Sequence, residues 1–221
     1  MIEEFPDFSS YENEYDNILD VEEKAKVSEA LRDYFSAMKD LMYKDNLFEK
    51  IDDKQKEEKI CDLEDYIFKR LYRKLFPSLL SEQDLFISQK CEQLSNLKPE
   101  QLIQDTRIIK KGFLKEASSY FSQINMGISP KEKIEYIIKG LKVIYNLITL
   151  TTGKEIKDQG ADDLCDPFYY SLIISKIKNL ASNVQYINMF IDKNLVNAYY
   201  FRISNDLADF LTVINESTIY E

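Results

Sequence analysis

The side chains in this sequence with the clearest potential for chemistry are two adjacent carboxylates, Asp162 and Asp163. Paired carboxylates can serve as general acid and base in a hydrolase, but they then need a metal, a further base or an oxyanion-stabilising partner. The sequence shows no such partner beside them, and it contains no histidine. Catalytic triads, imidazole acid–base catalysis and histidine-containing metal sites are therefore excluded, and a hydrolase is the weakest of the candidate functions.

Glycine and cysteine spacing bears on nucleotides, cofactors and metals. The five glycines are never closer than seven positions apart, so neither a phosphate-binding P-loop nor a dinucleotide-binding fingerprint can be written. Cys61, Cys91 and Cys165 are widely separated and lack the paired spacing of a zinc site. We expect these thiols to be reduced packing residues of a cytoplasmic protein, and we expect neither a metal nor a cofactor.

The distribution of charge narrows the possible partners. The net charge of −10, from 29 Lys and Arg against 39 Asp and Glu, argues against binding to nucleic acid or anionic lipid. The imbalance lies entirely in residues 1–70, which carry 21 acidic and 11 basic side chains, whereas residues 71–221 carry 18 of each. The longest apolar-rich stretch, 141–150, is far shorter than the roughly 20 residues of a membrane-spanning helix. The first 23 residues hold nine acids and no base, which is unlike a signal peptide.

The elements that position the candidate residues are predicted from apolar spacing. Apolar residues recur at intervals of three and four, and strand-like alternation fails even in the Ile-rich segment 134–148, so we predict an all-α fold. The expected helices cover residues 21–42, 60–75, 130–148, 168–177, 182–190 and 198–214. Segment 168–177 is apolar on nearly all sides, which is typical of a central helix that is covered on every face.

Capping residues and prolines set the expected helix starts. Ser129, Pro130 and Glu132 supply an N-cap, a first-turn proline and a capping-box partner. In the same way Asp166 is expected to cap the central helix with Pro167 in its first turn. Ser182 is expected to cap the helix that follows. These signals divide the all-helical chain into segments of ordinary length.

Charge and periodicity together divide the chain into three parts. Residues 1–20 are acidic with no sustained period, which predicts a flexible arm. Residues 21–94 are expected to form an N-terminal helical bundle. This bundle is expected to pack on a layered helical domain that covers residues 95–217.

Three motifs in a fixed order carry a resemblance to a known family. They are Gly-Ala-Asp-Asp-Leu at 160–164, Ser-Asn-Val-Gln-Tyr-Ile at 182–187 and Tyr-Tyr-Phe at 199–201. Asp162 and Asn183 lie 21 positions apart, which fits the register of the family. The chain therefore resembles the Vps-nine domain, the catalytic module of exchange factors for early-endosomal Rab GTPases. The resemblance covers roughly residues 66–217.

The resemblance implies a layered helical domain that presents an apolar groove to the switch regions of a Rab. The implied activity is guanine nucleotide exchange on an early-endosomal (Rab five subgroup) Rab, without covalent chemistry and without a cofactor. Asp162 matches the acidic finger that reaches into the nucleotide site, and Tyr199 matches the tyrosine that lines the groove. Partner-binding roles fall on Asn183, Asp166, Pro167 and Arg202. A monomeric, cytoplasmic protein that is recruited to endosomal membranes through its partners is expected.

Other interpretations stay open. Taken singly, acids ahead of a helix can simply stabilise its positive end, and Tyr199 or Asn183 also fits a structural role. Two departures from the family pattern bear on function: the proline after the acidic turn comes one position late, at Pro167, and Arg202 stands where a threonine is frequent. The alternative function is therefore a Rab-binding scaffold or effector that keeps the fold but lacks exchange activity.

Overall fold

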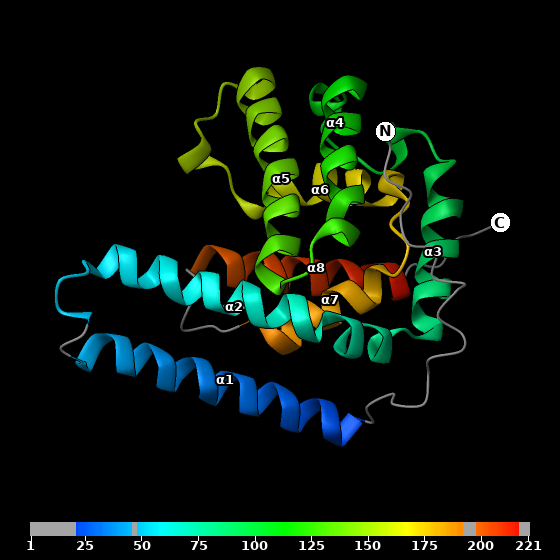
Figure 1. Ribbon diagram of the computed structural model, residues 1–221. Helices are drawn as coiled ribbons and strands as arrows, with labels where there is room; N and C mark the ends of the chain where they lie inside the picture. Colours follow the sequence, from blue (N-terminus) through cyan, green and yellow to red (C-terminus); the bar gives the residue numbers. More distant parts are fainter. Residues whose placement is uncertain (1–20, 46–47, 192–197, 217–221) are drawn as a thin grey trace, which may run out of the picture.

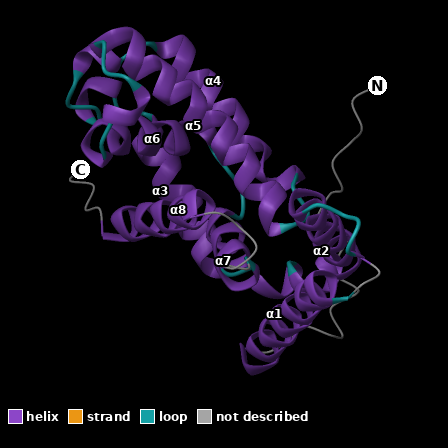
Figure 2. Ribbon diagram, turned by 90° about the vertical axis from the view of Figure 1, so that its left-hand side faces the viewer, coloured by secondary structure: helices purple, strands orange, loops and turns teal. Residues whose placement is uncertain are grey.

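The computed structural model describes residues 21–45, 48–191 and 198–216, and within these ranges every regular element is a helix (Figures 1 and 2). The α-helices are α1 (Val21–Lys44), α2 (Asp53–Leu75), α3 (Glu82–Ser95), α4 (Lys111–Phe121), α5 (Pro130–Thr152), α6 (Ala161–Ser175), α7 (Leu180–Phe190) and α8 (Ala198–Glu216). Short 3-10 turns are η3 (Pro77–Leu79), η4 (Pro99–Gln101), η5 (Thr106–Ile108), η6 (Ser122–Met126) and η7 (Ile156–Asp158). The predicted all-α fold is confirmed.

Two sequence predictions concern membranes and the chain start. Among the described helices, none is long and apolar enough to cross a lipid bilayer. The predicted acidic arm, residues 1–20, lies outside the described residues. The part of the chain that can be described therefore begins with α1.

Helices α1 and α2 form a hairpin that lies beside α7 (Figures 1 and 2). A separate, aromatic-rich cluster joins them, and its buried members are Phe35, Phe68, Leu75, Phe76, Leu79, Tyr186 and Phe190. The ring of Phe68 lies 6.0 Å from those of Phe35 and Phe190 and 6.1 Å from that of Tyr186, between centroids. The Ser28 hydroxyl of α1 also donates a hydrogen bond of 2.6 Å to a carbonyl oxygen of α7. Aromatic packing against α7 therefore attaches the hairpin.

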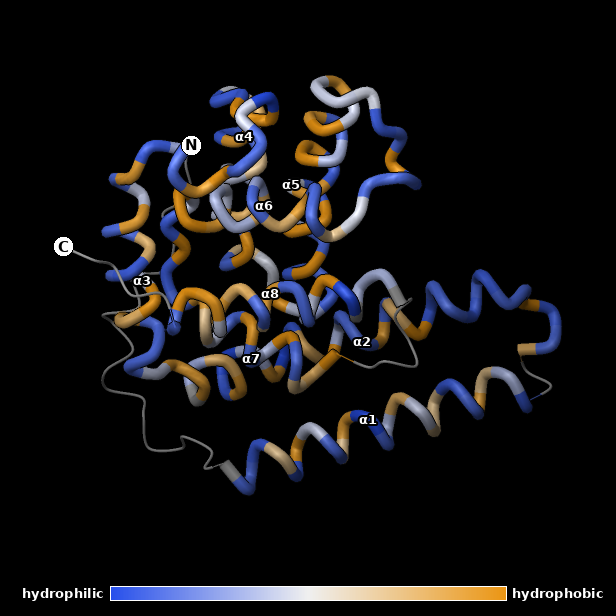
Figure 3. The backbone as a smooth tube through the Cα atoms, turned by 180° about the vertical axis from the view of Figure 1, so that it is seen from behind, coloured by the Kyte–Doolittle hydropathy of each residue, from blue (hydrophilic) through white to orange (hydrophobic). Residues whose placement is uncertain are grey.

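The other helices share one larger core. Helices α4 and α5 pair, α6 packs against both of them, and α3 contacts α6, α7 and α8. Figure 3 shows apolar residues interspersed along α6, α7 and α8 and mostly hydrophilic residues along α2. Ile87, Cys91 and Leu94 of α3 are buried in this core, although the predicted bundle of residues 21–94 includes that helix. The boundary near residue 94, between the predicted helical bundle and the predicted layered domain, stays a prediction. Of the free cysteines, Cys61 and Cys165 are partly buried.

Helices α4 and α5 approach each other closely at Gly140. A Cβ atom at this position would lie 2.2 Å from Cε1 of Phe121 and 2.9 Å from the carbonyl oxygen of Ala117. Both distances are far below van der Waals contact, and the second involves backbone that cannot turn away. Glycine at residue 140 is therefore required by the close packing of α4 against α5.

We expect Gly140→Ala to lower the free energy of unfolding by about 1–3 kcal/mol, measured by urea denaturation. The clash with Phe121 and Ala117 outweighs the roughly 1 kcal/mol by which alanine favours a helix. Gly112→Ala is the matched control, because a Cβ there meets nothing within 4 Å. Equal stability of Gly140→Ala and the wild type would contradict the close approach.

The predicted start of α5 is confirmed. Ser129 is the N-cap, and Pro130 is the first helical residue. The Ser129 hydroxyl oxygen accepts a hydrogen bond of 3.2 Å from the Glu132 amide. The Glu132 carboxylate accepts in return from the amides of Ile128 at 2.8 Å and Ser129 at 3.3 Å. These reciprocal bonds satisfy donors that the first helical turn leaves without carbonyl partners.

The predicted start of the central helix is wrong. Helix α6 begins at Ala161 rather than after Asp166, so Asp166 and Pro167 lie in its second turn. The Asp163 carboxylate accepts a hydrogen bond of 3.0 Å from the Gly160 amide and so caps a helix that begins six residues before the predicted start at Pro167. The helix continues through Pro167 even though proline has no amide hydrogen to donate. Its packing against α3, α4 and α5 agrees with a central position.

The predicted cap of α7 is also wrong. Helix α7 begins at Leu180, which places Ser182 in its first turn. The Ser182 amide donates to the Asp84 carboxylate of α3 at 3.0 Å, and its hydroxyl donates to the carbonyl oxygen of Leu79 at 2.8 Å. Ser182 is buried away from water. The amide in the first turn of α7 therefore finds its hydrogen-bond acceptor in a side chain of α3 rather than in a neighbouring residue of the sequence.

Candidate functional site

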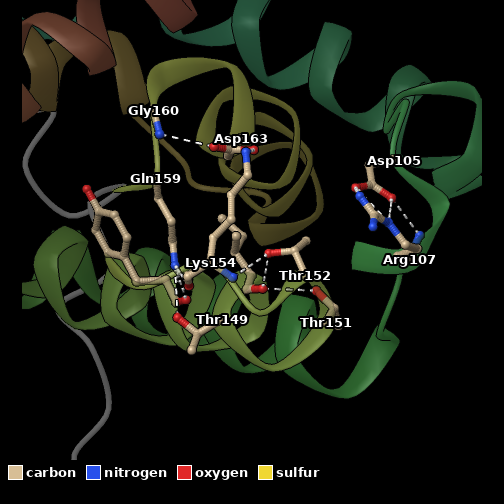
Figure 4. A network of polar contacts seen from close by, with 11 residues as sticks. Asp105, Arg107, Thr149, Thr151, Thr152, Lys154, Gln159, Gly160 and Asp163 are labelled. Carbon is tan, nitrogen blue, oxygen red and sulfur yellow. Dashed lines mark hydrogen bonds and ion pairs between the residues drawn. The ribbon is translucent and has the colours of Figure 1, made fainter. Parts of the chain in front are cut away.

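The segment between α5 and α6 is tied back to α5 (Figure 4) and leads to Asp162 in the first turn of α6. Gly153 follows α5 in the left-handed conformation, with φ of 77°, which ends the helix. The Gln159 side-chain amide then donates to the carbonyl oxygen of Tyr145 at 3.1 Å and to Oγ1 of Thr149 at 2.9 Å. It also lies 3.2 Å from a carbonyl oxygen of the turn itself. The residue that precedes the first turn of α6 is therefore held against the last turns of α5.

The two adjacent acids at the start of α6 have different surroundings. The Asp163 carboxylate accepts from the Gly160 amide at 3.0 Å and pairs with Nζ of Lys154 at 2.6 Å. The Lys154 ammonium, and after it the Gly160 amide, hold the pKa of Asp163 below its usual value. Asp162 is exposed, and its carboxylate has no hydrogen bond or ion pair with any residue that the structure describes. Asp163 thus stabilises the turn while Asp162 faces solvent.

Asp166 and Pro167 border a hollow on one side of α6. The Asp166 carboxylate accepts a hydrogen bond of 2.9 Å from the amide of Gln104, which joins α6 to the segment before η5. Pro167 is buried. A hollow of about 310 Å³ lies between residues 103–108 and the first turns of α6, and Asp162, Asp166 and Pro167 line it. Three of the predicted site residues are therefore neighbours in space.

Helix α8 brings Tyr199 and Arg202 to the same α5–α6 turn. The Arg202 guanidinium donates to the Tyr145 hydroxyl at 2.8 Å and lies over the Tyr199 ring, 5.3 Å from its centroid. Burial, with a smaller effect from Tyr145, raises the pKa of Tyr199 to about 12, so its phenol stays neutral at physiological pH. We name the hollow of about 710 Å³ beside them the Tyr199 groove. Its lining includes Tyr199, Arg202, Tyr145, Gln159, Ile156 and Lys142.

A third hollow, of about 260 Å³, links the first two. It shares Cys165 with the hollow beside Asp166, and Tyr145, Gln159 and Arg202 with the Tyr199 groove. The structure thus places five of the six predicted site residues on three hollows that share lining residues: Asp162, Asp166, Pro167, Tyr199 and Arg202. Within the described ranges, no cluster of acidic or cysteine side chains is arranged to hold a metal ion. The surface offers the exposed Asp162 carboxylate, which has no described partner, and the carboxylates of Asp206 and Asp209 in the third hollow, beside a groove that is partly apolar and partly cationic.

The sixth predicted residue, Asn183, lies in the interior. Its side chain is fully buried. Oδ1 of Asn183 accepts from Nζ of Lys133 at 2.8 Å, and Nδ2 donates to Oδ1 of Asn125 and to the carbonyl oxygen of Asn179, both at 2.7 Å. In this structure Asn183 supports the framework behind the surface, and its predicted role in partner binding stays a prediction.

Lys133, the partner of Asn183, is a buried lysine enclosed by aromatic rings. Its Nζ also donates to the carbonyl oxygen of Ile124 and to the hydroxyl of Tyr72, both at 3.2 Å. The same atom lies 4.6 Å from the ring centroid of Phe76 and 5.7 Å from that of Tyr186. Burial lowers the pKa of Lys133 to about 7. This side chain connects α5 to both α2 and α7.

Sequence reasoning missed three residues that shape this region. Lys154 and Gln159 lie in a turn without periodic apolar spacing, so nothing local distinguishes them from solvated loop residues. Lys133 did carry a signal, because it precedes Ile137 by four positions and so falls on the apolar face of α5. A lysine on such a face indicates either that the lysine has a buried partner or that the predicted apolar face is wrong at that position.

Residues 114–203 match the family model described as the vacuolar sorting protein 9 (VPS9) domain. The matched range runs from α4 to the beginning of α8 and contains all six predicted site residues. No curated protein matched the chain. Residues 114–203 of the chain therefore form a VPS9 domain, the domain that characterises a family of Rab guanine nucleotide exchange factors.

Proposed function

We propose that this protein accelerates GDP release from a Rab GTPase of the early-endosomal Rab five subgroup, with Asp162 as its acidic finger. A VPS9 domain implies Rab exchange activity in general. The observation that carries the finer assignment is the exposed Asp162 carboxylate, which has no partner among the described residues and lines one of three hollows, linked by shared lining residues, that include the Tyr199 groove. We further propose that this groove receives the switch regions and that the protein acts as a monomer recruited to endosomal membranes through its partners.

The physical basis of this activity is the competition between a carboxylate and a phosphate. A Rab holds GDP through Mg²⁺ and a P-loop lysine, both cations, so an inserted carboxylate can take the place of a phosphate beside them. One charge pair at about 4 Å, at an effective dielectric constant near 20, contributes about 4 kcal/mol before desolvation. This corresponds to about three powers of ten in the rate of GDP release. Exchange needs no proton transfer, so the absence of histidine is no obstacle.

Thermodynamic linkage adds a requirement on binding. Whatever affinity the Rab loses for nucleotide when the exchange factor is bound, it loses for the exchange factor when nucleotide is bound. The protein should therefore bind the nucleotide-free Rab tightly and the loaded Rab weakly. A pull-down with nucleotide-free and GDP-loaded Rab measures this difference directly.

The test of the proposal is a GDP-release assay with a panel of Rab GTPases. Each Rab is loaded with fluorescent GDP, mixed with the protein and excess GTP, and followed by the loss of fluorescence. We expect acceleration that is strongest for the early-endosomal subgroup. Unchanged release for every Rab would contradict exchange activity, whereas acceleration confined to other Rabs would contradict only the choice of subgroup.

The alternative is a Rab-binding scaffold or effector without exchange activity. Two observations favour it: Arg202 stands at the groove where a threonine is frequent in the family, and Pro167 lies inside α6, one position later than the family pattern. An inactive protein that still captures GTP-loaded Rab would support this alternative. Acceleration of GDP release would exclude it.

We expect Arg202→Ala to raise the Rab concentration needed for half-maximal exchange about five- to tenfold and to change the maximal rate less than twofold. Arg202 orients Tyr199 by stacking and Tyr145 by a charged hydrogen bond, which typically contributes about 1–3 kcal/mol. Exchange kinetics over a range of Rab concentrations separate the two quantities. Arg73→Ala, at an exposed position of α2, is the control. A large fall in maximal rate would instead place Arg202 at the nucleotide site.

A further inference from the structure

We propose that Lys154 is a positioning residue for Asp162, because it fixes the first turn of α6 to the end of α5. This inference rests on the proposed function, since it assigns a task to a residue that acts through the acidic finger. It concerns a residue outside the three sequence motifs, in a turn that carries no local signal of function.

The contact that carries the inference is the ion pair between Lys154 and Asp163. Its atoms are 2.6 Å apart, and only 20% of the Asp163 side chain is exposed, against 47% for Lys154. The same carboxylate accepts the Gly160 amide, so one group holds both the lysine and the backbone immediately before α6. Asp162 lies between Gly160 and Asp163 in the sequence. Any shift of this turn therefore moves the Asp162 carboxylate.

Lys154 is itself anchored to α5. Its backbone amide donates to Oγ1 of Thr152 at 3.2 Å, and Thr152 Oγ1 in turn donates to the carbonyl oxygen of Ile148 at 2.8 Å. Figure 4 shows these contacts beside the hydrogen bonds of Gln159 to Tyr145 and Thr149 of α5 and to the carbonyl oxygen of Lys154. The end of α5, Lys154, Asp163 and the start of α6 thus form one continuous polar connection.

A second support comes from the opposite side of the turn. The Asp166 carboxylate binds the Gln104 amide, so the first two turns of α6 are held by segments on both flanks. The three carboxylates at positions 162, 163 and 166 lie within one short stretch, yet cations or amides from the described residues engage only the second and third. The arrangement fixes the turn while leaving the first acid exposed.

A positioning role and a purely electrostatic role of Lys154 predict opposite changes in the exchange rate when Lys154 is removed. Removing a positive charge makes the turn more negative, and on charge alone this favours approach to the cations of a nucleotide site. Loss of a brace allows the turn to shift, and a displacement of about 1 Å at a reacting group can lower a rate by up to about 100-fold. The direction of the effect therefore separates the two explanations.

The experiment measures GDP release by the full chain as a function of its concentration, for Lys154→Met, Lys154→Arg and Asp163→Asn. We expect Lys154→Met and Asp163→Asn to lower the maximal rate about tenfold with half-saturation changed less than twofold. Lys154→Arg restores the ion pair and should recover the rate to within about twofold of wild type. Lys115→Met, at an exposed lysine of α4, is the matched control for loss of charge.

A structural measurement accompanies the kinetics. Hydrogen exchange of the Gly160 amide should become faster in Lys154→Met while the thermal unfolding midpoint stays near that of wild type. A maximal rate for Lys154→Met equal to or above wild type would overturn the inference, provided that wild type is active and Asp162→Ala is impaired. Absence of exchange in the wild type would overturn the proposed function and this inference together, so the two failures are distinguishable.

Discussion

Asp162→Ala is expected to lower the maximal rate of GDP release about 100-fold while the protein stays folded. The full charge pair contributes about 4 kcal/mol, and desolvation of the carboxylate offsets part of it, which leaves about 2.7 kcal/mol for 100-fold. Folding should survive because the Asp162 carboxylate is exposed and has no bond to any described residue. Its loss removes only a favourable interaction with the positive end of α6, about 0.3–1 kcal/mol. Stopped-flow release of fluorescent GDP measures the rate, and thermal unfolding measures the stability.

Two further variants define what Asp162 contributes. Asp162→Asn keeps the size and removes the charge, so a loss similar to that of Asp162→Ala would assign the effect to electrostatics. Asp158→Ala removes an exposed acid of η7, in the same turn, and should leave the rate unchanged. Equal maximal rates for wild type and Asp162→Ala would remove Asp162 from the mechanism.

The second large effect is a pH dependence of stability that arises from Lys133. Burial lowers the pKa of this lysine to about 7 from its usual 10.5, so between these two values the unfolded chain binds more protons than the folded one. Stability therefore rises with pH from about 7 to about 10.5, and the full cost of the buried charge is present below pH 7. The whole separation corresponds to about 5 kcal/mol, and we expect a change of a few kcal/mol across pH 7–10.

The comparison with Lys133→Met isolates this contribution, because other titrating groups, the tyrosines included, are common to both proteins. We expect the unfolding free energy of wild type minus that of Lys133→Met to increase as the pH rises from 7 to 10. Urea denaturation at several pH values measures this difference. Lys139→Met removes an exposed lysine of the same helix and controls for loss of charge. A difference between wild type and Lys133→Met that does not change with pH would contradict the lowered pKa.

Local signals predicted much of the fold. The predicted helices 130–148 and 198–214 correspond to α5 and α8, because apolar spacing and the cap at Ser129 act within one turn of the chain. The predicted start of α6 was wrong, and the reason is physical. Asp163 and Asp166 are both capable caps, and the position of Lys154 and Gly160 decides in favour of Asp163.

Contacts between distant residues were beyond prediction from one sequence. The Asp84 carboxylate accepts a hydrogen bond from the Ser182 amide, which lies 98 positions later in the sequence. Nothing near Ser182 in the sequence indicates this contact, so a local cap was predicted instead. The bond between Lys133 and Asn183 spans 50 positions and places inside the protein a side chain that the family resemblance assigned to partner binding. Both depend on which helices pack together.

The sequence by itself determined that the chain is helical, that a histidine-dependent mechanism is excluded, and that the acids near residue 160 follow a family pattern, because composition and helical period are properties of the chain alone. Only the tertiary structure decided which acid stays available. Asp163 is engaged by a lysine nine positions away and Asp166 by an amide 62 positions away, whereas Asp162 meets no described partner. Lys154 reaches Asp163, and the Gln104 amide reaches Asp166, only when the segments on either side of α6 have packed against it, so tertiary packing leaves Asp162 as the exposed acid.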